Sequence, residues 1–241
     1  MRATLASRNA NKARELARLL PGWEIEPLAV DEYPPEAGAT YYENAHAKAE
    51  FGRAHVDAQH WTLGEDSGIE VAGLGGGPGV HSSRSAAGDE VVWMLSELDG
   101  MEGDARRARY VCELVALGPD GTELRGTGTL KGRIATAPSG TAGFGFDPVF
   151  IPEGEDQSVA ELGDNWKAEH SHRAKAARAL LRSLEAGVAR NGTISNRSLE
   201  GSSARAAPQA NPSSSSTVRC SRRLVLHQLS SAPNTITFAI T

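Results

Sequence analysis

The segment Arg2-Ala-Thr-Leu-Ala-Ser-Arg-Asn-Ala-Asn-Lys12 decides the fold class, because it joins a short buried strand directly to a helix. The apolar run up to Ala6 predicts the strand, and leucines on one face predict a helix from about Ala10 to Leu20. Further along, Pro119-Asp120-Gly121 separates two strand-like runs and predicts a hairpin. Strands and helices mixed in this way indicate an α/β architecture with a mixed β-sheet.

The composition is that of an ordinary globular protein. The 241 residues are 39% hydrophobic and 23% charged, and the net charge is -5. The two cysteines, Cys112 and Cys220, lie far apart in the sequence and suit a reducing cytosol. No apolar run is long enough to span a membrane, and the apolar stretch after Met1 is too short for a signal peptide. We therefore expect a cytoplasmic protein with no membrane partner.

The composition changes after Gly187, which predicts a domain over residues 1–187 and a tail over residues 188–241. The tail has eleven serines, six arginines and one glutamate, so its charge is +5 and that of the domain is -10. We expect the tail to be disordered or weakly ordered. Because phosphate backbones favour basic surfaces, the acidic domain should not bind nucleic acid. Contact of the basic tail with nucleic acid is the less favoured alternative to a solvated extension.

The junction between the first strand and the first helix is a candidate anion site. Backbone N–H groups in the first turn of a helix are unpaired, and the helix dipole is positive there. Asn9 suits the N-cap position, Ser7 adds a hydroxyl group and Lys12 lies in the first turn. The spacing is not that of a P-loop, and an ordinary capped helix with a surface lysine is the alternative.

A second candidate is Glu65-Asp66-Ser67-Gly68. It lies in the stretch from Gly64 to Gly68, which we expect to form a turn between short extended segments at Trp61–Leu63 and Ile69–Val71. Carboxylates on such a turn could hold Mg²⁺ and orient a water molecule, whereas the alternative is a solvated turn. Glu43 is a further candidate ligand. It also fits the capping box Thr40-Tyr-Tyr-Glu43, in which it would only cap its own helix.

A third candidate combines the loop Phe144-Gly-Phe-Asp147 with Lys167 and His172-Arg173. Two aromatic side chains on a glycine-rich loop could stack on a planar base. The Asp, His and Arg side chains supply donors and acceptors for the edge of that base. Each residue alone is more often a core aromatic or a surface charge, so the argument depends on their occurrence together.

Several short motifs occur in a specific order along the chain. They are Ser7-Arg-Asn-Ala-Asn-Lys12, Tyr42-Glu-Asn-Ala45 with Lys48, Glu65-Asp-Ser-Gly68, Leu74-Gly-Gly-Gly-Pro-Gly79 with Ser83-Arg84, Gly143-Phe-Gly-Phe-Asp-Pro-Val-Phe150, Ala160-Glu-Leu162, Lys167 and Ser171-His-Arg173. In this order they resemble the Ham1/inosine triphosphate pyrophosphatase family, the non-standard purine nucleoside triphosphate pyrophosphatases. The resemblance covers about Arg2 to Leu184.

The resemblance implies hydrolysis of ITP, dITP and XTP to the monophosphate and pyrophosphate, with Mg²⁺, by a cytoplasmic homodimer. It also implies an elongated mixed sheet in two lobes with the substrate in a central cleft. Asp66 is implied as the proton acceptor and a metal ligand, and Glu43 as the second metal ligand. The residues implied to bind substrate are Ser7, Arg8, Asn9, Ala10, Asn11, Lys12, Ser67, Phe144, Gly145, Phe146, Asp147, Lys167, His172 and Arg173.

Three positions depart from the usual pattern of the family. Arg8 stands where Gly is usual, Phe146 replaces a frequent Tyr, and His81 stands where Tyr is common. None of these changes removes Lys12 or the carboxylates. A non-catalytic nucleotide sensor on the same fold is the alternative function. The intact Glu65-Asp66 pair argues against it, because a pure binding protein has little need of a base.

Overall fold

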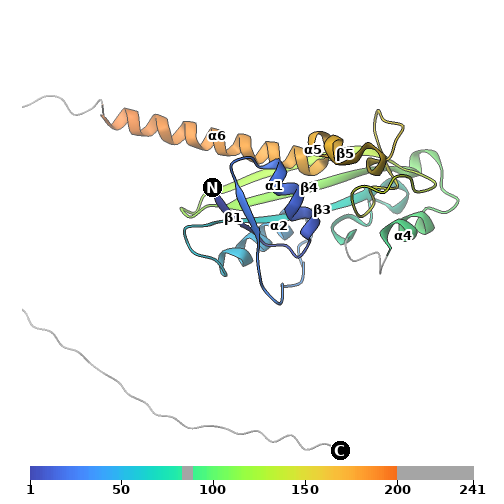
Figure 1. Cartoon of the computed structure of the whole chain (residues 1–241), viewed down its shortest axis with the longest axis horizontal. Helices are drawn as coiled ribbons and strands as arrows, with labels where there is room; N and C mark the ends of the chain where they lie inside the picture. The colour runs from blue at the N-terminus through green and yellow to red at the C-terminus, as the bar shows by residue number, and fades with distance from the viewer. Residues whose placement is uncertain (83–88, 200–241) are drawn as a thin grey trace, which may run out of the picture. The chain divides into compact units, whose positions relative to one another are not determined.

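The structure is a computed structural model that describes residues 1–82 and 89–199, with side chains up to residue 187. These residues form a six-stranded mixed sheet in the order β2-β1-β3-β4-β5-β6, with helices on both faces (Figure 1). The strands are β1 (Arg2–Leu5), β2 (Glu24–Pro27), β3 (Trp61–Val71), β4 (Arg107–Leu117), β5 (Glu123–Ile134) and β6 (Phe150–Pro152). The helices are α1 (Ala10–Leu19), α2 (Tyr41–Arg53), α4 (Glu90–Glu97), α5 (Val159–His170) and α6 (His172–Leu199), with 3₁₀ turns η1 (Ala72–Leu74), η2 (Gly79–His81) and η3 (Gly103–Arg106).

The difference in length between β1 and β3 creates the open position in the sheet where the site forms. β1 runs parallel to both β2 and β3, whereas β3, β4, β5 and β6 pair in antiparallel fashion. β1 pairs with β3 only from Trp61 to Leu63. From Gly64 onward, this edge of β3 is therefore free of β1. The chain leaving β1 turns into α1 beside that free edge.

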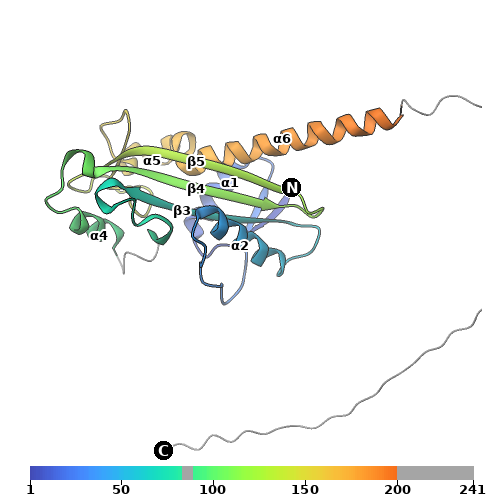
Figure 2. The same ribbon diagram turned by 180° about the vertical axis from the view of Figure 1, so that it is seen from behind.

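Glycines on the strands allow two helices to lie directly against opposite faces of the sheet (Figure 2). A Cβ atom on Gly64 of β3 would lie 1.8 Å from the carbonyl oxygen of Ala45 in α2. A Cβ atom on Gly128 of β5 would lie 2.0 Å from the carbonyl oxygen of His172 in α6. Only glycine permits so close an approach of helix backbone to strand backbone. These contacts set the distance of α2 and α6 from the sheet.

Two large apolar cores lie along the same three long strands, and a third, smaller cluster lies between α2 and β4. One contains Leu5, Leu16 and Leu180 and reaches β3 at Leu63. The other contains residues of α4, β6 and the loop before β6, and it reaches β3 at Ile69. Residues 64–68 of β3 lie between the two cores. This arrangement confirms the predicted α/β mixed sheet with flanking helices, and it leaves the polar residues of β3 at the junction of two halves.

The predicted turn at Gly64–Gly68 is wrong, because β3 continues through it without interruption from Trp61 to Val71. The glycines that suggested a turn serve close packing instead. Gly64 faces α2, and a Cβ atom on Gly68 would lie 2.1 Å from the carbonyl oxygen of Gly79. Since side chains alternate along a strand, Glu65 and Asp66 point to opposite faces of the sheet.

The C-terminal helix α6 extends past the predicted domain boundary. The Ser171 hydroxyl accepts a hydrogen bond from the Ala174 N–H at 3.1 Å and so caps α6. The helix then passes Gly187, the predicted domain boundary, and ends at Leu199. Residues 200–241 of the predicted tail, and Ser83-Arg84, lie outside the described residues. Within the part that is described, no helix has both the length and the apolar character needed to cross a membrane.

The predicted hairpin is confirmed by β4 and β5, and the first strand and helix by β1 and α1. Helix α5 has no counterpart among the expected elements. Its two halves meet at Gly163, whose φ of 79° is not helical. This break interrupts the helical periodicity that a sequence reading depends on.

Gly64→Ala should destabilise the fold, because the added methyl group overlaps the backbone of α2. We expect the free energy of unfolding to fall by about 1–3 kcal/mol, the usual cost of overpacking. Urea denaturation measures this loss. The control is Gly187→Ala, whose methyl group would meet nothing within 4 Å. Removing a helical glycine there should leave stability unchanged or raise it by about 0.5–1 kcal/mol. A Gly64→Ala variant as stable as the wild type would contradict the close packing.

Candidate active site

The N-terminus of α1 lies beside the free edge of β3. The Asn9 side chain caps the helix by accepting hydrogen bonds from the N–H groups of Asn11 and Lys12 at 3.0 and 3.3 Å. The Ser7 hydroxyl accepts one from the Asn9 N–H at 3.2 Å. Arg8 is directed elsewhere, because its guanidinium donates to the Asp31 carbonyl oxygen. This segment therefore presents Lys12 and an ordered helix N-terminus to β3, as expected for an anion site.

Asp66 lies on the face of β3 that α2 covers. Its two carboxylate oxygens accept hydrogen bonds from the Asn44 side-chain amide at 3.1 Å and from the Lys48 ammonium at 2.8 Å. The Lys48 ammonium also contacts Glu36 Oε1 at 2.5 Å. Burial raises the pKa of Asp66 above its ordinary value, and Lys48 opposes this rise. Asp66 is therefore a buried carboxylate that is oriented on both oxygens.

Glu65 lies on the opposite face of β3 and is fully buried. Its carboxylate contacts Lys12 Nζ at 2.6 Å and Arg173 Nη2 at 2.9 Å, and it accepts a hydrogen bond from the Cys112 thiol at 3.4 Å. Burial alone would raise the pKa of Glu65. The two cations outweigh burial and hold that pKa well below its ordinary value. Glu65 is therefore an anion that joins α1 to α6.

The ion pairs around Glu65 extend through further charged residues toward the loop that carries Phe144 and Asp147. Arg173 also pairs with Glu15 of α1, and Glu15 contacts Lys167 Nζ at 2.7 Å. Lys167 in turn contacts Asp147 Oδ2 at 2.6 Å. The result is a chain of alternating charges formed by Lys12, Glu65, Arg173, Glu15, Lys167 and Asp147. Because each charge in this chain has an oppositely charged neighbour, the cluster tolerates burial.

Phe144 lies where this chain of charges ends. Its backbone N–H donates to Asp147 Oδ2 at 2.8 Å, and the Lys167 ammonium lies 4.2 Å from the centre of its ring. Nearby, the His172 ring stacks on Tyr110 with 4.5 Å between centroids. Burial and the adjacent Arg173 hold the pKa of His172 well below its ordinary value, so the imidazole is neutral at neutral pH.

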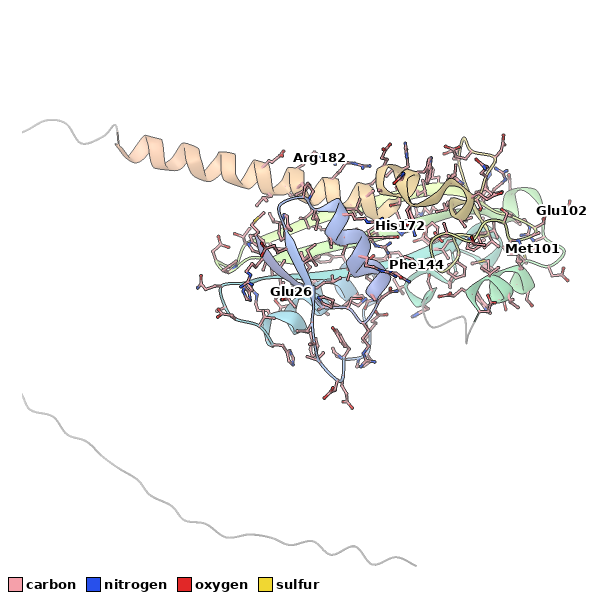
Figure 3. All side chains as sticks on the ribbon, viewed as in Figure 1. Glu26, Met101, Glu102, Phe144, His172 and Arg182 are labelled. Carbon is pink, nitrogen blue, oxygen red and sulfur yellow. The ribbon has the colours of Figure 1, made fainter. Side chains whose placement is uncertain are left out.

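One cavity of about 100 Å³ brings together residues expected to bind phosphate and residues expected to bind the base. The predicted site residues that line it are Asn9, Lys12, Ser67, Phe144, Gly145, Phe146, Asp147, Lys167, His172 and Arg173. Figure 3 labels Phe144 and His172 close together near the middle of the molecule's described part. Asn11 lines a neighbouring cavity that shares Phe144 and Lys167 with this one. The Nδ1 atom of His172 is buried and has no hydrogen-bond partner among the described residues.

Five predicted site residues line neither of these two cavities. They are Ser7, Arg8, Ala10, Glu43 and Asp66. Ser7 and Ala10 lie beside the Asn9 cap, and Arg8 packs its guanidinium 5.1 Å from the centre of the Tyr33 ring. Asp66 precedes Ser67 in β3 and faces the other side of the sheet. The site therefore surrounds the free edge of β3 from both faces.

Glu43 caps its own helix, whereas Glu36 shares a cation with Asp66. The Glu43 carboxylate accepts hydrogen bonds from the N–H groups of Ala39 and Thr40, completing the capping box. No hydrogen bond or ion pair between described residues links it to Asp66. Glu36, which we did not expect, reaches Asp66 through their shared partner Lys48. Glu36 lies in a proline-containing loop, which has no helix or strand periodicity from which its position could be predicted.

Asn44 and Lys48 are further site residues that the motif analysis did not assign. Their spacing of one helical turn places both side chains on the same face of α2, where they meet Asp66. A helix predicted over this segment therefore already places Asn44 and Lys48 on one face. Tyr110 is another unassigned residue, and it lines the cavity beside His172.

Comparison with known proteins places these features in a family. A model of the Ham1 family matches residues 3–183. The chain belongs to the Ham1 family. A dITP/XTP pyrophosphatase of Bdellovibrio bacteriovorus is 40% identical over 196 residues, which is 77% of this chain and 98% of that protein. A dITP/XTP pyrophosphatase of Thermus thermophilus is 40% identical over 195 residues, covering 78% of this chain and 93% of the relative.

Solved structures of Ham1 proteins agree with this assignment. The Ham1 protein of Staphylococcus aureus is 30% identical, with a TM-score of 0.67. The match covers 78% of this chain and 100% of the Staphylococcus aureus chain. A nucleoside-triphosphatase, or dITP/XTP pyrophosphatase, of Mycobacterium abscessus is 36% identical, with a TM-score of 0.59. The match covers 75% of this chain and 97% of the Mycobacterium abscessus chain. The Ham1 family resemblance read from the sequence is thereby confirmed.

Glu65→Gln should change how stability depends on pH. The folded pKa of Glu65 lies below its ordinary value of 4.5, so its stabilising contribution is complete above that value. The contribution is lost as the pH falls through the folded pKa. We expect the variant to be less stable than the wild type at pH 7, and the gap to shrink below about pH 4.5.

Urea denaturation at a series of pH values measures this difference in the free energy of unfolding. Glu97→Gln, a change at an exposed glutamate of α4, is the matched control and should show no such gap. A gap between Glu65→Gln and wild type that stays constant down to pH 2 would contradict the ion pairing of Glu65.

Proposed function

We propose that this Ham1 protein hydrolyses the non-standard purine nucleoside triphosphates ITP, dITP and XTP to the monophosphate and pyrophosphate. The observation that carries the proposal is the single cavity that joins Lys12 at the α1 N-terminus to Phe144, Lys167 and Arg173. Such a cavity offers cationic groups to a triphosphate at one end and an aromatic ring to a base at the other. The names of the relatives, dITP/XTP pyrophosphatases, support the same substrate class.

Recognition of the base follows from the groups around Phe144. The ring stacks on the purine, and the Lys167 and Arg173 side chains donate hydrogen bonds toward the 6-keto oxygen. Adenine presents an amino group at that position, so these donors would face another donor. An unpaired buried polar group costs about 1–3 kcal/mol, which disfavours adenine nucleotides.

Hydrolysis requires a group that accepts a proton from water, and Asp66 is the candidate. Its oxygen takes the proton while the water oxygen forms a bond to phosphorus and the anhydride bond between the α and β phosphates breaks. Pyrophosphate leaves, and its negative charge is balanced by Lys12 and the α1 N-terminus. Asn44 keeps the Asp66 carboxylate in a fixed orientation during this step.

The residues around Asp66 fit a magnesium ion. Mg²⁺ is usually held by one or two carboxylates and completes its shell with water and substrate phosphates. Asp66 and Glu36 already share one cation, the Lys48 ammonium, and they would hold the metal in place of the expected pair Asp66 and Glu43. Among residues 1–82 and 89–187, whose side chains the structure describes, no group of three or more His, Cys, Asp or Glu side chains is placed to hold a metal ion, so water and substrate phosphates would complete the shell. When bound, the metal would neutralise phosphate charge.

Two further expectations complete the proposal. The homodimer implied by the family resemblance is tested by the mass of the protein in solution. A cytoplasmic location accords with the free, buried thiol of Cys112, since cysteines stay reduced in that compartment.

Asp66→Asn should abolish most of the turnover of dITP. Loss of a general base lowers the rate by about 10²–10⁴-fold, and the amide is close in shape to the carboxylate. The assay measures phosphate with and without added inorganic pyrophosphatase, in the presence of Mg²⁺. Phosphate that appears only after that addition supports pyrophosphate release, whereas direct release indicates a phosphatase. Binding of dITP by the wild type without turnover would instead support the nucleotide sensor.

Glu36→Gln and Glu43→Gln should separate the metal ligand from the helix cap. Removing a carboxylate from the metal should raise the Mg²⁺ concentration for half-maximal activity by roughly 10–100-fold in Glu36→Gln. Glu43→Gln should keep both the Mg²⁺ requirement and most of the stability, because the glutamine side-chain oxygen can still accept the hydrogen bonds of the capping box. The reverse pattern would restore Glu43 as the ligand.

A further inference from the structure

The Lys48 ammonium occupies the position between the two carboxylates that the metal would need. Its nitrogen lies 2.5 Å from Glu36 Oε1, 2.8 Å from Asp66 Oδ1 and 3.1 Å from the carbonyl oxygen of Glu65. The side chain is only 16% exposed. Three oxygen atoms, two of them anionic, thus surround one buried cation. A divalent ion bound by the same oxygens would have to displace this ammonium.

We propose that Lys48 blocks the divalent cation site of the nucleotide-free protein, so that the metal binds well only together with a nucleotide. The inference rests on the proposed function for the identity of the nucleotide, but the blocking itself depends only on these contacts. An ammonium and a magnesium ion cannot occupy one space between two carboxylates. Their mutual repulsion also disfavours simultaneous binding.

A triphosphate offers Lys48 another anionic partner. Lysine carries its charge on a flexible four-carbon stem, so the ammonium can turn from the carboxylates to a phosphate while α2 stays in place. Asp66 does not lose its orientation when this happens, because its other oxygen still accepts the hydrogen bond from Asn44 at 3.1 Å. The vacated oxygens of Glu36 and Asp66 then face the metal that accompanies the phosphates.

This exchange makes the binding of metal and nucleotide mutually dependent. If the nucleotide tightens metal binding by removing Lys48, the metal must tighten nucleotide binding by the same factor. Lys48 acts here as a positioning residue: it determines when the two carboxylates are available. Without a nucleotide, Asp66 remains paired with an ammonium rather than with a metal ion.

The test is a titration of the nucleotide-free protein with Mn²⁺. Binding is measured as the decrease of the free Mn²⁺ signal in electron paramagnetic resonance. Mn²⁺ takes octahedral oxygen ligands as Mg²⁺ does. We expect weak binding by the wild type and binding at least about 10-fold tighter by Lys48→Met, because the buried Asp66 carboxylate and the half-buried Glu36 carboxylate then lack their shared cation. Adding Asp66→Asn to Lys48→Met should remove the gain and so locate the ion.

Lys131→Met is the matched control, because it makes the same change at an exposed lysine of β5. It should bind Mn²⁺ as weakly as the wild type. Equal Mn²⁺ affinity of wild type and Lys48→Met would overturn the proposal, and so would a gain in Lys131→Met of the same size. Circular dichroism checks that Lys48→Met is folded, and Lys48→Gln replaces it if the methionine variant is not.

A second measurement uses the unaltered protein. The titration is repeated with an inosine triphosphate analogue that has a methylene group between the α and β phosphates and cannot be cleaved there. Mn²⁺ should bind the wild-type complex at least about 10-fold more tightly than the protein or the analogue alone. The absence of this coupling would overturn the inference even if no variant folds. If the analogue does not bind at all, the proposed function fails, and the nucleotide-free comparison still decides the role of Lys48.

Discussion

The buried carboxylate of Glu65 constrains the arrangement of the whole site. A fully buried anion is costly unless cations and hydrogen bonds surround it, and its partners come from two helices that are distant in sequence. Lys12 of α1 reaches it from one side and Arg173 of α6 from the other. The strand that carries Glu65 therefore cannot be buried without bringing both helices to it. The two ends of the cavity, at Lys12 and at Phe144, are thus positioned by one shared carboxylate.

Adjacent residues of one strand acquire opposite electrostatic character through pleating alone. Glu65 and Asp66 differ by one position, yet they face different helices. The pKa of Glu65 is lowered by two close cations, whereas burial prevails over Lys48 and raises that of Asp66. A structural anion and a more basic carboxylate stand side by side in the sequence. This division resembles other enzymes in which two carboxylates have separate roles because their surroundings differ.

Local patterns in the sequence were sufficient for the regular parts of the fold. The strand and helix at residues 2–20 and the β4–β5 hairpin followed from periodicity and turn residues. The segment around Asp66 was misread because glycine indicates a turn locally, while here Gly64 permits contact with α2, a tertiary cause that no short pattern contains. The ordered motifs located most cavity residues. They did not indicate Glu36, because its contact with Lys48 depends on how a proline-containing loop folds back toward α2.

The thiol of Cys112 adds a chemical consequence to the central ion cluster. It is buried, and burial together with the neighbouring Glu65 carboxylate raises its pKa well above the ordinary value. Oxidants such as peroxides attack the thiolate form, which is then scarce at neutral pH. The sulfur atom can therefore contribute a hydrogen bond at the centre of the enzyme without making it a target of oxidative inactivation.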